Sequence, residues 1–145
     1  MTRIATLIAV VVVALSTAGA ASPAASYESF YARVSAYALS SIGLLQVNGY
    51  ASYRDYDCTP SYACDRNVMV EFTVHRGLST YSPVVGRAYD ETGQYGSSAS
   101  ATFRLPTCRL IRKYTSITYT VEMVAVAPTG LEKTASTFVY HRSCQ

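Results

Sequence analysis

The sequence predicts an all-β protein, an antiparallel β-sandwich of about seven strands that carries two disulfides. Segments in which apolar and polar side chains alternate recur along the chain, and Pro or Gly residues separate many of them. The abundance of Tyr, Val, Thr and Ser suits strands that are buried on one face and hydrated on the other. Because no convincing helix lies between these segments, two packed antiparallel sheets are favoured over a parallel or mixed fold.

The first twenty residues predict a secretory signal peptide, residues 1–20. Arg3 supplies a positive charge, an apolar run follows from Ile4 to Leu15, and Ala18-Gly19-Ala20 matches the small-x-small cleavage pattern. The run is shorter than the roughly 20 apolar residues that cross a bilayer, so we expect a secreted, extracellular protein with no membrane anchor. After cleavage, residues 21–29 are expected to form a flexible leader and residues 30–145 a single sandwich domain.

Alternation locates the individual strands. Residues 30–38 fit one face of a strand, which we favour, but a helix over residues 27–40 stays open because Tyr27, Phe30, Val34 and Tyr37 also fit a helical stripe. The later strands are predicted at residues 45–53, 68–74, 84–90, 97–105, 117–125 and 131–141. Asp90 to Gly93 predicts a hairpin between the third and fourth of these, and Ala127 to Gly130 predicts a type II turn.

The same alternation predicts which side chains form the core. We expect Val70, Phe72, Phe103 and Val121 to be buried, and Glu71, Thr73 and Glu122 to be exposed. The strand number and the Pro-Thr-Gly turn resemble an immunoglobulin-like or fibronectin-like sandwich. The resemblance concerns architecture alone and implies no site residues. Trp is absent from the chain, which disfavours an antibody-type domain with a core Trp between paired cysteines.

Four cysteines in a small secreted domain predict two disulfides. Of the three possible connectivities we favour Cys58 with Cys64, across a short loop that contains Pro60, and Cys108 with Cys144, near the C-terminus. A zinc site is disfavoured because the C-x5-C spacing is wider than usual and the compartment is oxidising. No metal and no other cofactor is expected.

The charge balance argues against a nucleic-acid partner. Without the signal peptide the chain has 11 basic and 9 acidic side chains, a net charge close to +2. The basic cluster of Arg109, Arg112 and Lys113 is too small to steer a nucleic acid.

A Tyr-rich segment from Tyr50 to Asp65 is the predicted binding surface, and an extracellular protein or a cell-surface glycan is the predicted partner. Tyrosine offers a broad ring with a polar edge and few torsions to fix on binding. A purely structural role, in which these rings only cover the edge of the sandwich, stays open because the chain has 13 tyrosines. The candidate ligand-binding residues are Tyr50, Tyr53, Arg54, Tyr56 and Tyr62.

Three further functions compete with this one. A calcium site at Asp55, Asp57 and Asp65 is disfavoured, since the segment lacks the Gly turn and bidentate Glu of a calcium loop. A protease inhibitor would present the rigid loop from Cys58 to Cys64, with Tyr62 as the residue that enters the protease pocket.

A small secreted hydrolase, nuclease-like, is the third. Glu71 and His75 share one face of a predicted strand, and His141 would join them from the last strand as a general acid or base. No G-x-S-x-G motif nominates a serine nucleophile. We therefore favour binding over catalysis.

Overall fold

The computed structural model describes residues 28–55, 67–92 and 97–144, and these form seven β-strands and one short 3-10 helix, η2 (Cys108–Leu110). The predicted all-β class is confirmed. The segment that also fitted a helical stripe is a strand, β1. The strands are β1 (Glu28–Leu39), β2 (Leu44–Asp55), β3 (Met69–Arg76), β4 (Val84–Glu91), β5 (Ser97–Arg104), β6 (Ser116–Val126) and β7 (Glu132–Arg142).

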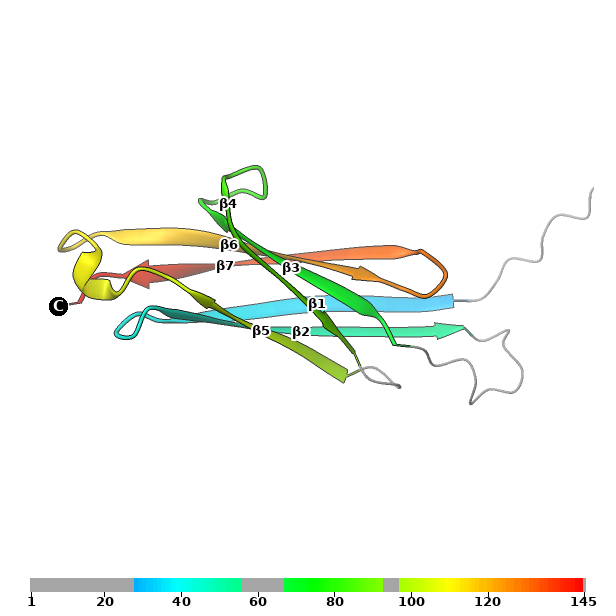
Figure 1. Ribbon diagram of the computed structural model, residues 1–145. Helices are drawn as coiled ribbons and strands as arrows, with labels where there is room; N and C mark the ends of the chain where they lie inside the picture. Colours follow the sequence, from blue (N-terminus) through cyan, green and yellow to red (C-terminus); the bar gives the residue numbers. More distant parts are fainter. Residues whose placement is uncertain (1–27, 56–66, 93–96, 145) are drawn as a thin grey trace, which may run out of the picture.

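The strands form two antiparallel sheets. One has three strands in the order β1-β2-β5, and the other has four in the order β4-β3-β6-β7. Figure 1 shows β6 and β7 above β1 and β2, with β3 and β4 crossing in front, and β1 runs beside β7. No helix within the described ranges is long and apolar enough to span a membrane. The predicted signal peptide and most of the predicted leader lie outside these ranges.

Side chains from both sheets meet in one hydrophobic cluster. Leu45 and Val47 of β2 pack there with Phe72 of β3 and Met123 of β6, and all four are fully buried. The sheets approach closely at Gly49 of β2, where a Cβ atom would lie 2.8 Å from Cε1 of Phe72. A larger residue at this position would therefore force the two sheets apart.

The predicted core is largely confirmed. Val70, Phe72 and Val121 are buried, and Phe103 is half-buried against the same cluster. The prediction for Thr73 was wrong, because this residue is buried on the outer side of β3. β3 is an interior strand, and the long side chains of Arg87 and Glu122 are the cross-strand neighbours of Thr73. Alternation predicts the face of a side chain, but its neighbours decide whether water reaches it.

The predicted hairpin between β4 and β5 was wrong. β4 pairs with β3 and β5 pairs with β2, so the chain passes from one sheet to the other between them. Side chains connect the two strands instead. The ring of Phe103 packs over Gly86, and the backbone N–H of Ser100 donates to Oδ2 of Asp90 at 2.8 Å. An alternating pattern carries no information about which strand is the hydrogen-bonded neighbour.

The turn between β6 and β7 is a hairpin turn, but not of type II. The N–H of Gly130 donates to the carbonyl of Ala127, and the N–H of Ala127 donates to the carbonyl of Leu131. A type II turn would need a positive φ at Thr129, whereas the positive φ, +84°, belongs to Gly130. The loop is therefore a type I turn followed by a left-handed glycine.

The disulfide between Cys108 and Cys144 is present as predicted. It joins η2 to the segment that follows β7. The predicted pair of Cys58 and Cys64 lies outside the described residues.

Tyr119 is expected to make the fold sensitive to alkaline pH. Burial raises the pKa of Tyr119 above its ordinary value of 10.0, and the positive charge of Arg76 opposes part of that rise. In the unfolded chain the phenol ionises at about pH 10. The contribution of Tyr119 to the free energy of unfolding is therefore complete below about pH 10, and it is lost as the pH rises through the higher pKa of the folded protein.

We therefore expect the variant Tyr119→Phe to lose less stability than the parent between about pH 9 and about pH 11. Thermal melting at both pH values measures the difference. The exposed Tyr114→Phe variant is the control and should follow the parent. Equal losses in the parent and in Tyr119→Phe would show that burial of this phenol does not govern the alkaline transition.

Candidate functional site on the outer face of the three-stranded sheet

The predicted Tyr-rich surface does not form a single surface, because successive side chains of β2 point to opposite faces of the sheet. Tyr50 and Arg54 point away from the core, whereas Tyr53 points inward, is 5% exposed and contacts Phe30 edge-on at 5.9 Å between ring centroids. Tyr53 is therefore a core residue and not part of an exposed surface. Tyr56 and Tyr62 lie outside the described residues.

Tyr50 and Arg54 belong instead to a larger polar face. Every second residue of β1, β2 and β5 points away from the core, and the antiparallel register places these side chains in rows. We call this surface the three-strand face. Its members are Ser29, Tyr31, Arg33, Ser35, Tyr37, Leu39, Leu44, Gln46, Asn48, Tyr50, Ser52, Arg54, Ser98, Ser100, Thr102 and Arg104.

The charges on the three-strand face have one sign. Arg33, Arg54 and Arg104 are spread along it, and no Asp or Glu stands among its described outward-facing residues. The other side chains are tyrosines, amides and hydroxyls, with Leu39 and Leu44 at one end of the face. The polar groups form hydrogen bonds while neutral, so none of these side chains adds a charge that would oppose an anion.

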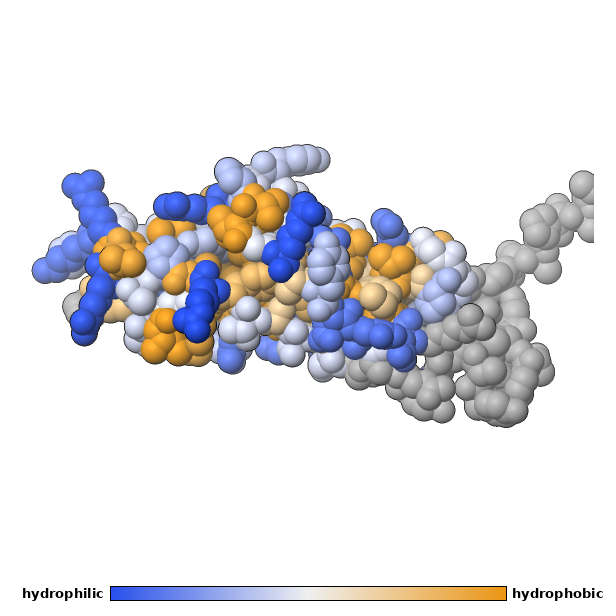
Figure 2. Space-filling view, viewed as in Figure 1, coloured by the Kyte–Doolittle hydropathy of each residue, from blue (hydrophilic) through white to orange (hydrophobic). Residues whose placement is uncertain are grey.

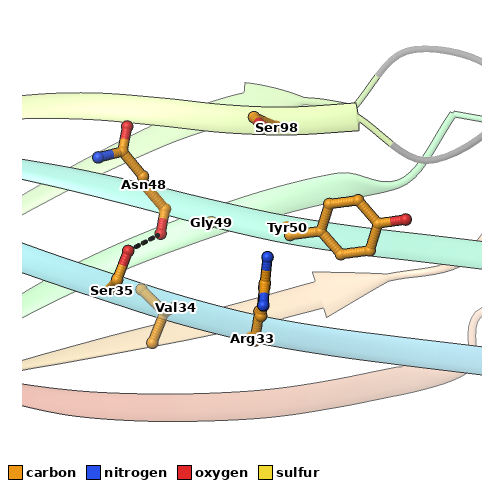
Figure 3. A pocket seen from close by; sticks show the side chains of 7 residues that line it. All are labelled: Arg33, Val34, Ser35, Asn48, Gly49, Tyr50 and Ser98. Carbon is orange, nitrogen blue, oxygen red and sulfur yellow. Dashed lines mark hydrogen bonds between the residues drawn. The ribbon is translucent and has the colours of Figure 1, made fainter.

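A hollow of about 350 Å³ lies near the centre of the three-strand face (Figure 3). Arg33 and Tyr50 line one part of it, Ser35 and Asn48 another, and Ser98 of β5 completes the rim. Its floor is formed by the backbone of Val34 and Gly49, because the Val34 side chain points toward the core and Gly49 has no side chain. The Ser35 hydroxyl donates to the carbonyl of Asn48 at 3.3 Å.

The aromatic and cationic groups of the three-strand face contact one another. The Arg33 guanidinium carbon lies 5.6 Å from the centroid of the Tyr50 ring. The Tyr31 and Tyr50 rings are 6.1 Å apart at an angle of 57°. The cation–π contact orders the guanidinium before a ligand binds, which lowers the entropic cost of binding.

Sequence reasoning missed Tyr31, Arg33 and Tyr37. Their signal was present, because they alternate with the apolar residues of β1. The open choice between helix and strand hid it, since a helix would scatter these side chains around its circumference. Only the pairing of β1 with β2 brings them beside Tyr50.

The residues of the hydrolase hypothesis do not converge. His75 was expected on a solvent-facing surface, but it is 4% exposed and lies beneath the loop 77–83. Its Nδ1–H donates to the carbonyl of Ser82 at 2.8 Å, and its Nε2 is 3.5 Å from the Glu122 carboxylate. The register also shifts at this point, since Val74 pairs with Gly86 and His75 pairs with Val84, which leaves Val85 as an extra residue of β4 next to the loop.

His141 lies on the opposite face of the same sheet. It is fully buried and contacts the core residue Tyr119. Its Nε2–H donates to the carbonyl of Pro106, and Nδ1 is 3.1 Å from the Ser40 hydroxyl. Both ring nitrogens thus have structural partners. Glu71, in turn, accepts from the Tyr89 hydroxyl at 3.2 Å.

The inhibitor and calcium hypotheses concern residues that lie mainly outside the described ranges. The loop from Cys58 to Cys64 is one such segment, and Asp57 and Asp65 are also outside. In the described part of the chain, no three His, Cys, Asp or Glu side chains gather into a group that would hold a metal ion.

Comparison with models of protein families, with curated proteins and with solved structures gives no match for this chain. The chemistry of the three-strand face is therefore the ground for a functional assignment.

Proposed function

We propose that the protein is a secreted, non-catalytic binding module, and that its three-strand face binds an acidic glycan of a cell surface. The observation that carries the proposal is the composition of that face. Tyrosines, arginines, amides and hydroxyls share one face of the sheet, on which no described outward-facing residue is acidic.

We also propose that the two sheets form a sandwich, fibronectin-like rather than of the constant immunoglobulin type. Both sheets contribute to one apolar cluster, which supports a two-layer arrangement. In a constant immunoglobulin domain the fourth strand joins the sheet of the first, second and fifth. Here β4 joins β3 in the other sheet. This difference favours the fibronectin-like arrangement.

The exposed rings suit a sugar chain. Tyr31 and Tyr37 are about half exposed and lie on either side of the hollow along β1. A pyranose presents a flat face of C–H groups that packs on an aromatic ring, and its hydroxyls accept and donate hydrogen bonds at the rim. The Asn48 and Gln46 amides and the serine hydroxyls supply those partners.

The arginines suit an acidic sugar in particular. A guanidinium donates two parallel hydrogen bonds to one carboxylate, sulfate or phosphate group. Arg33 lines the hollow, while Arg54 and Arg104 lie farther along β2 and β5. A repeating anionic chain would meet more than one of them, which favours a polymer over a single small anion.

The test replaces the three outward tyrosines, Tyr31, Tyr37 and Tyr50, with Ala. Aromatic anchors contribute about 2 kcal/mol each, so we expect the Kd for a polyuronate fragment to rise at least about 100-fold. A neutral glucan of equal length should bind the parent protein much more weakly. Isothermal titration calorimetry measures both, and thermal melting verifies that the variant is folded.

A matched control alters three exposed aromatic residues of the four-stranded sheet, Tyr89, Phe138 and Tyr140. Their replacement with Ala should leave the Kd unchanged. The proposal is wrong if the control variant loses as much affinity as the first, or if the parent protein binds neither glycan. Arg33→Gln should weaken polyuronate binding much more than any glucan binding, because the anion contact is lost only for polyuronate, whereas the loss of the cation–π contact with Tyr50 affects both ligands.

A further inference from the structure

A second surface lies at the end of the molecule where η2, the β1–β2 turn and the end of β7 meet (Figure 1). The N–H of Cys108 donates to the carbonyl of Ser40 at 2.9 Å, and the disulfide ties Cys108 to Cys144. The N–H of Ser143 donates to the carbonyl of Thr115. The three segments therefore form one rigid unit.

This unit, which we call the cationic end, exposes four positive side chains. They are Arg109, Arg112, Lys113 and Arg142. No Asp or Glu occurs within its described segments, 40–43, 105–116 and 142–144. Figure 2 shows strongly hydrophilic side chains projecting from this end, with apolar ones between them.

Large apolar side chains lie among these cations. Leu110 is 77% exposed, Tyr114 is 85% exposed and Ile42 is 56% exposed. They come from two segments that the Cys108 to Ser40 hydrogen bond holds together. Single exposed apolar residues are ordinary on a protein surface, but three at one tip among four cations are not explained by the fold.

Tyr114 is exposed and has an unfavourable backbone conformation. Its φ is +63°, and it is the one non-glycine residue with a positive φ among those described. The N–H of Thr115 donates to the carbonyl of Arg112 across this turn, and the Lys113 ammonium lies 5.0 Å from the Tyr114 ring. A strained residue whose ring is largely in solvent and lies against a neighbouring cation points to a role outside the fold.

We propose that the cationic end docks reversibly on an anionic lipid surface. Leu110 and Ile42 would enter the boundary between headgroups and acyl chains, Tyr114 would lie at the headgroup level, and the cations would contact lipid phosphates. A soluble polyanion offers nothing to the two aliphatic side chains, so their presence favours lipid. The proposal is independent of glycan binding and describes a peripheral contact, not a membrane anchor.

The test is flotation of the full protein with vesicles. Vesicles of phosphatidylcholine with about 40% phosphatidylglycerol are expected to carry the protein, and vesicles of pure phosphatidylcholine are not. Each cation near such a surface strengthens binding about fivefold, so Arg112→Gln with Lys113→Gln should weaken binding roughly 25-fold. Raising the salt to about 0.5 M should have a comparable effect.

The variant that decides between lipid and a soluble polyanion is Leu110→Ser with Tyr114→Ser. This variant keeps every cation. The loss of two apolar side chains should weaken vesicle binding at least about tenfold, and such a loss would support insertion of these side chains into the lipid. Unchanged vesicle binding would overturn the lipid proposal in favour of a purely electrostatic site. Failure of the parent protein to float with anionic vesicles would overturn it as well.

A matched control lies at the far end, in the β6–β7 hairpin. Leu131→Ser with Lys133→Gln removes one exposed apolar side chain and one cation there, and should float as the parent does. Equal losses in this control would also contradict the proposal. The Tyr31, Tyr37 and Tyr50 variant should keep vesicle binding, so failure of the glycan proposal is distinguishable from failure of this one.

Discussion

Replacing Phe72 with Ala is expected to destabilise the protein by about 3–5 kcal/mol. Phe72 is fully buried and is the largest side chain in that condition among the described residues. Its ring reaches across the core to Gly49 of the other sheet. Truncation would leave a cavity where the two sheets meet, and the strands on both sides are too constrained by their ladders to collapse into it.

Denaturant unfolding of the two proteins measures this loss. Since small domains are stable by only about 5–15 kcal/mol, the variant should unfold at a much lower denaturant concentration. Phe138→Ala is the control, because Phe138 is a phenylalanine of the same sheet with its ring largely in solvent. It should change stability by no more than about 0.5 kcal/mol. An unchanged midpoint for Phe72→Ala would contradict the core described for β3.

The position of Phe72 illustrates what the sequence predicts well. In β3, alternation placed Val70, Phe72 and Val74 on one face, and this is the face that the structure buries. Period-two alternation is local information, because each side chain takes its direction from its own backbone. For the same reason β1 and β2 were located correctly to within a few residues.

Pairing is not local, and the errors follow from that. β4 and β5 are separated by a short connection with turn residues, which predicts a hairpin, yet they belong to different sheets. A chain that leaves one sheet for the other uses the same turn residues as a chain that doubles back. The contact of Phe103 with Gly86 and the bond of Ser100 to Asp90 appear only once both sheets are in place.

The candidate site shows both limits. The composition of the segment after Tyr50 drew attention to tyrosine and arginine, and Tyr50 and Arg54 do lie on the three-strand face. Counting aromatic residues did not separate Tyr50 from Tyr53, although their positions differ by an odd number and therefore face opposite ways. Tyr31 and Arg33 required knowledge that β1 pairs with β2.

The histidines show that residue type is a weak guide to chemistry. His75 and His141 are the chain's two histidines, and both are buried on opposite faces of one sheet. The Nδ1–H of His75 donates to the carbonyl of Ser82, and the Nε2–H of His141 donates to the carbonyl of Pro106. These bonds satisfy carbonyls at a loop and at the end of β5, so the imidazoles act there as hydrogen-bonding core residues.

Replacing both Cys108 and Cys144 with Ser is expected to destabilise the protein by about 4 kcal/mol. The bridge spans 36 residues, and closing a loop of that length restricts the unfolded chain strongly. The folded end would keep other connections, since the N–H of Cys144 donates to the carbonyl of Cys108 and His141 joins Ser40 to Pro106. The loss should therefore appear mainly as a gain in the entropy of the unfolded state.

Denaturant unfolding under non-reducing conditions measures this loss, with Arg109→Ser and Ser143→Ala together as the control that alters both neighbouring positions. The control should stay within about 0.5 kcal/mol of the parent, because neither side chain is part of the core. If the disulfide acts through the unfolded state, the folded variant without Cys108 and Cys144 should still float with anionic vesicles as the parent does. If the folded cysteine variant no longer floats, the disulfide also shapes the native cationic end. If the cysteine variant loses as little stability as the control, the hydrogen bonds alone hold this end together.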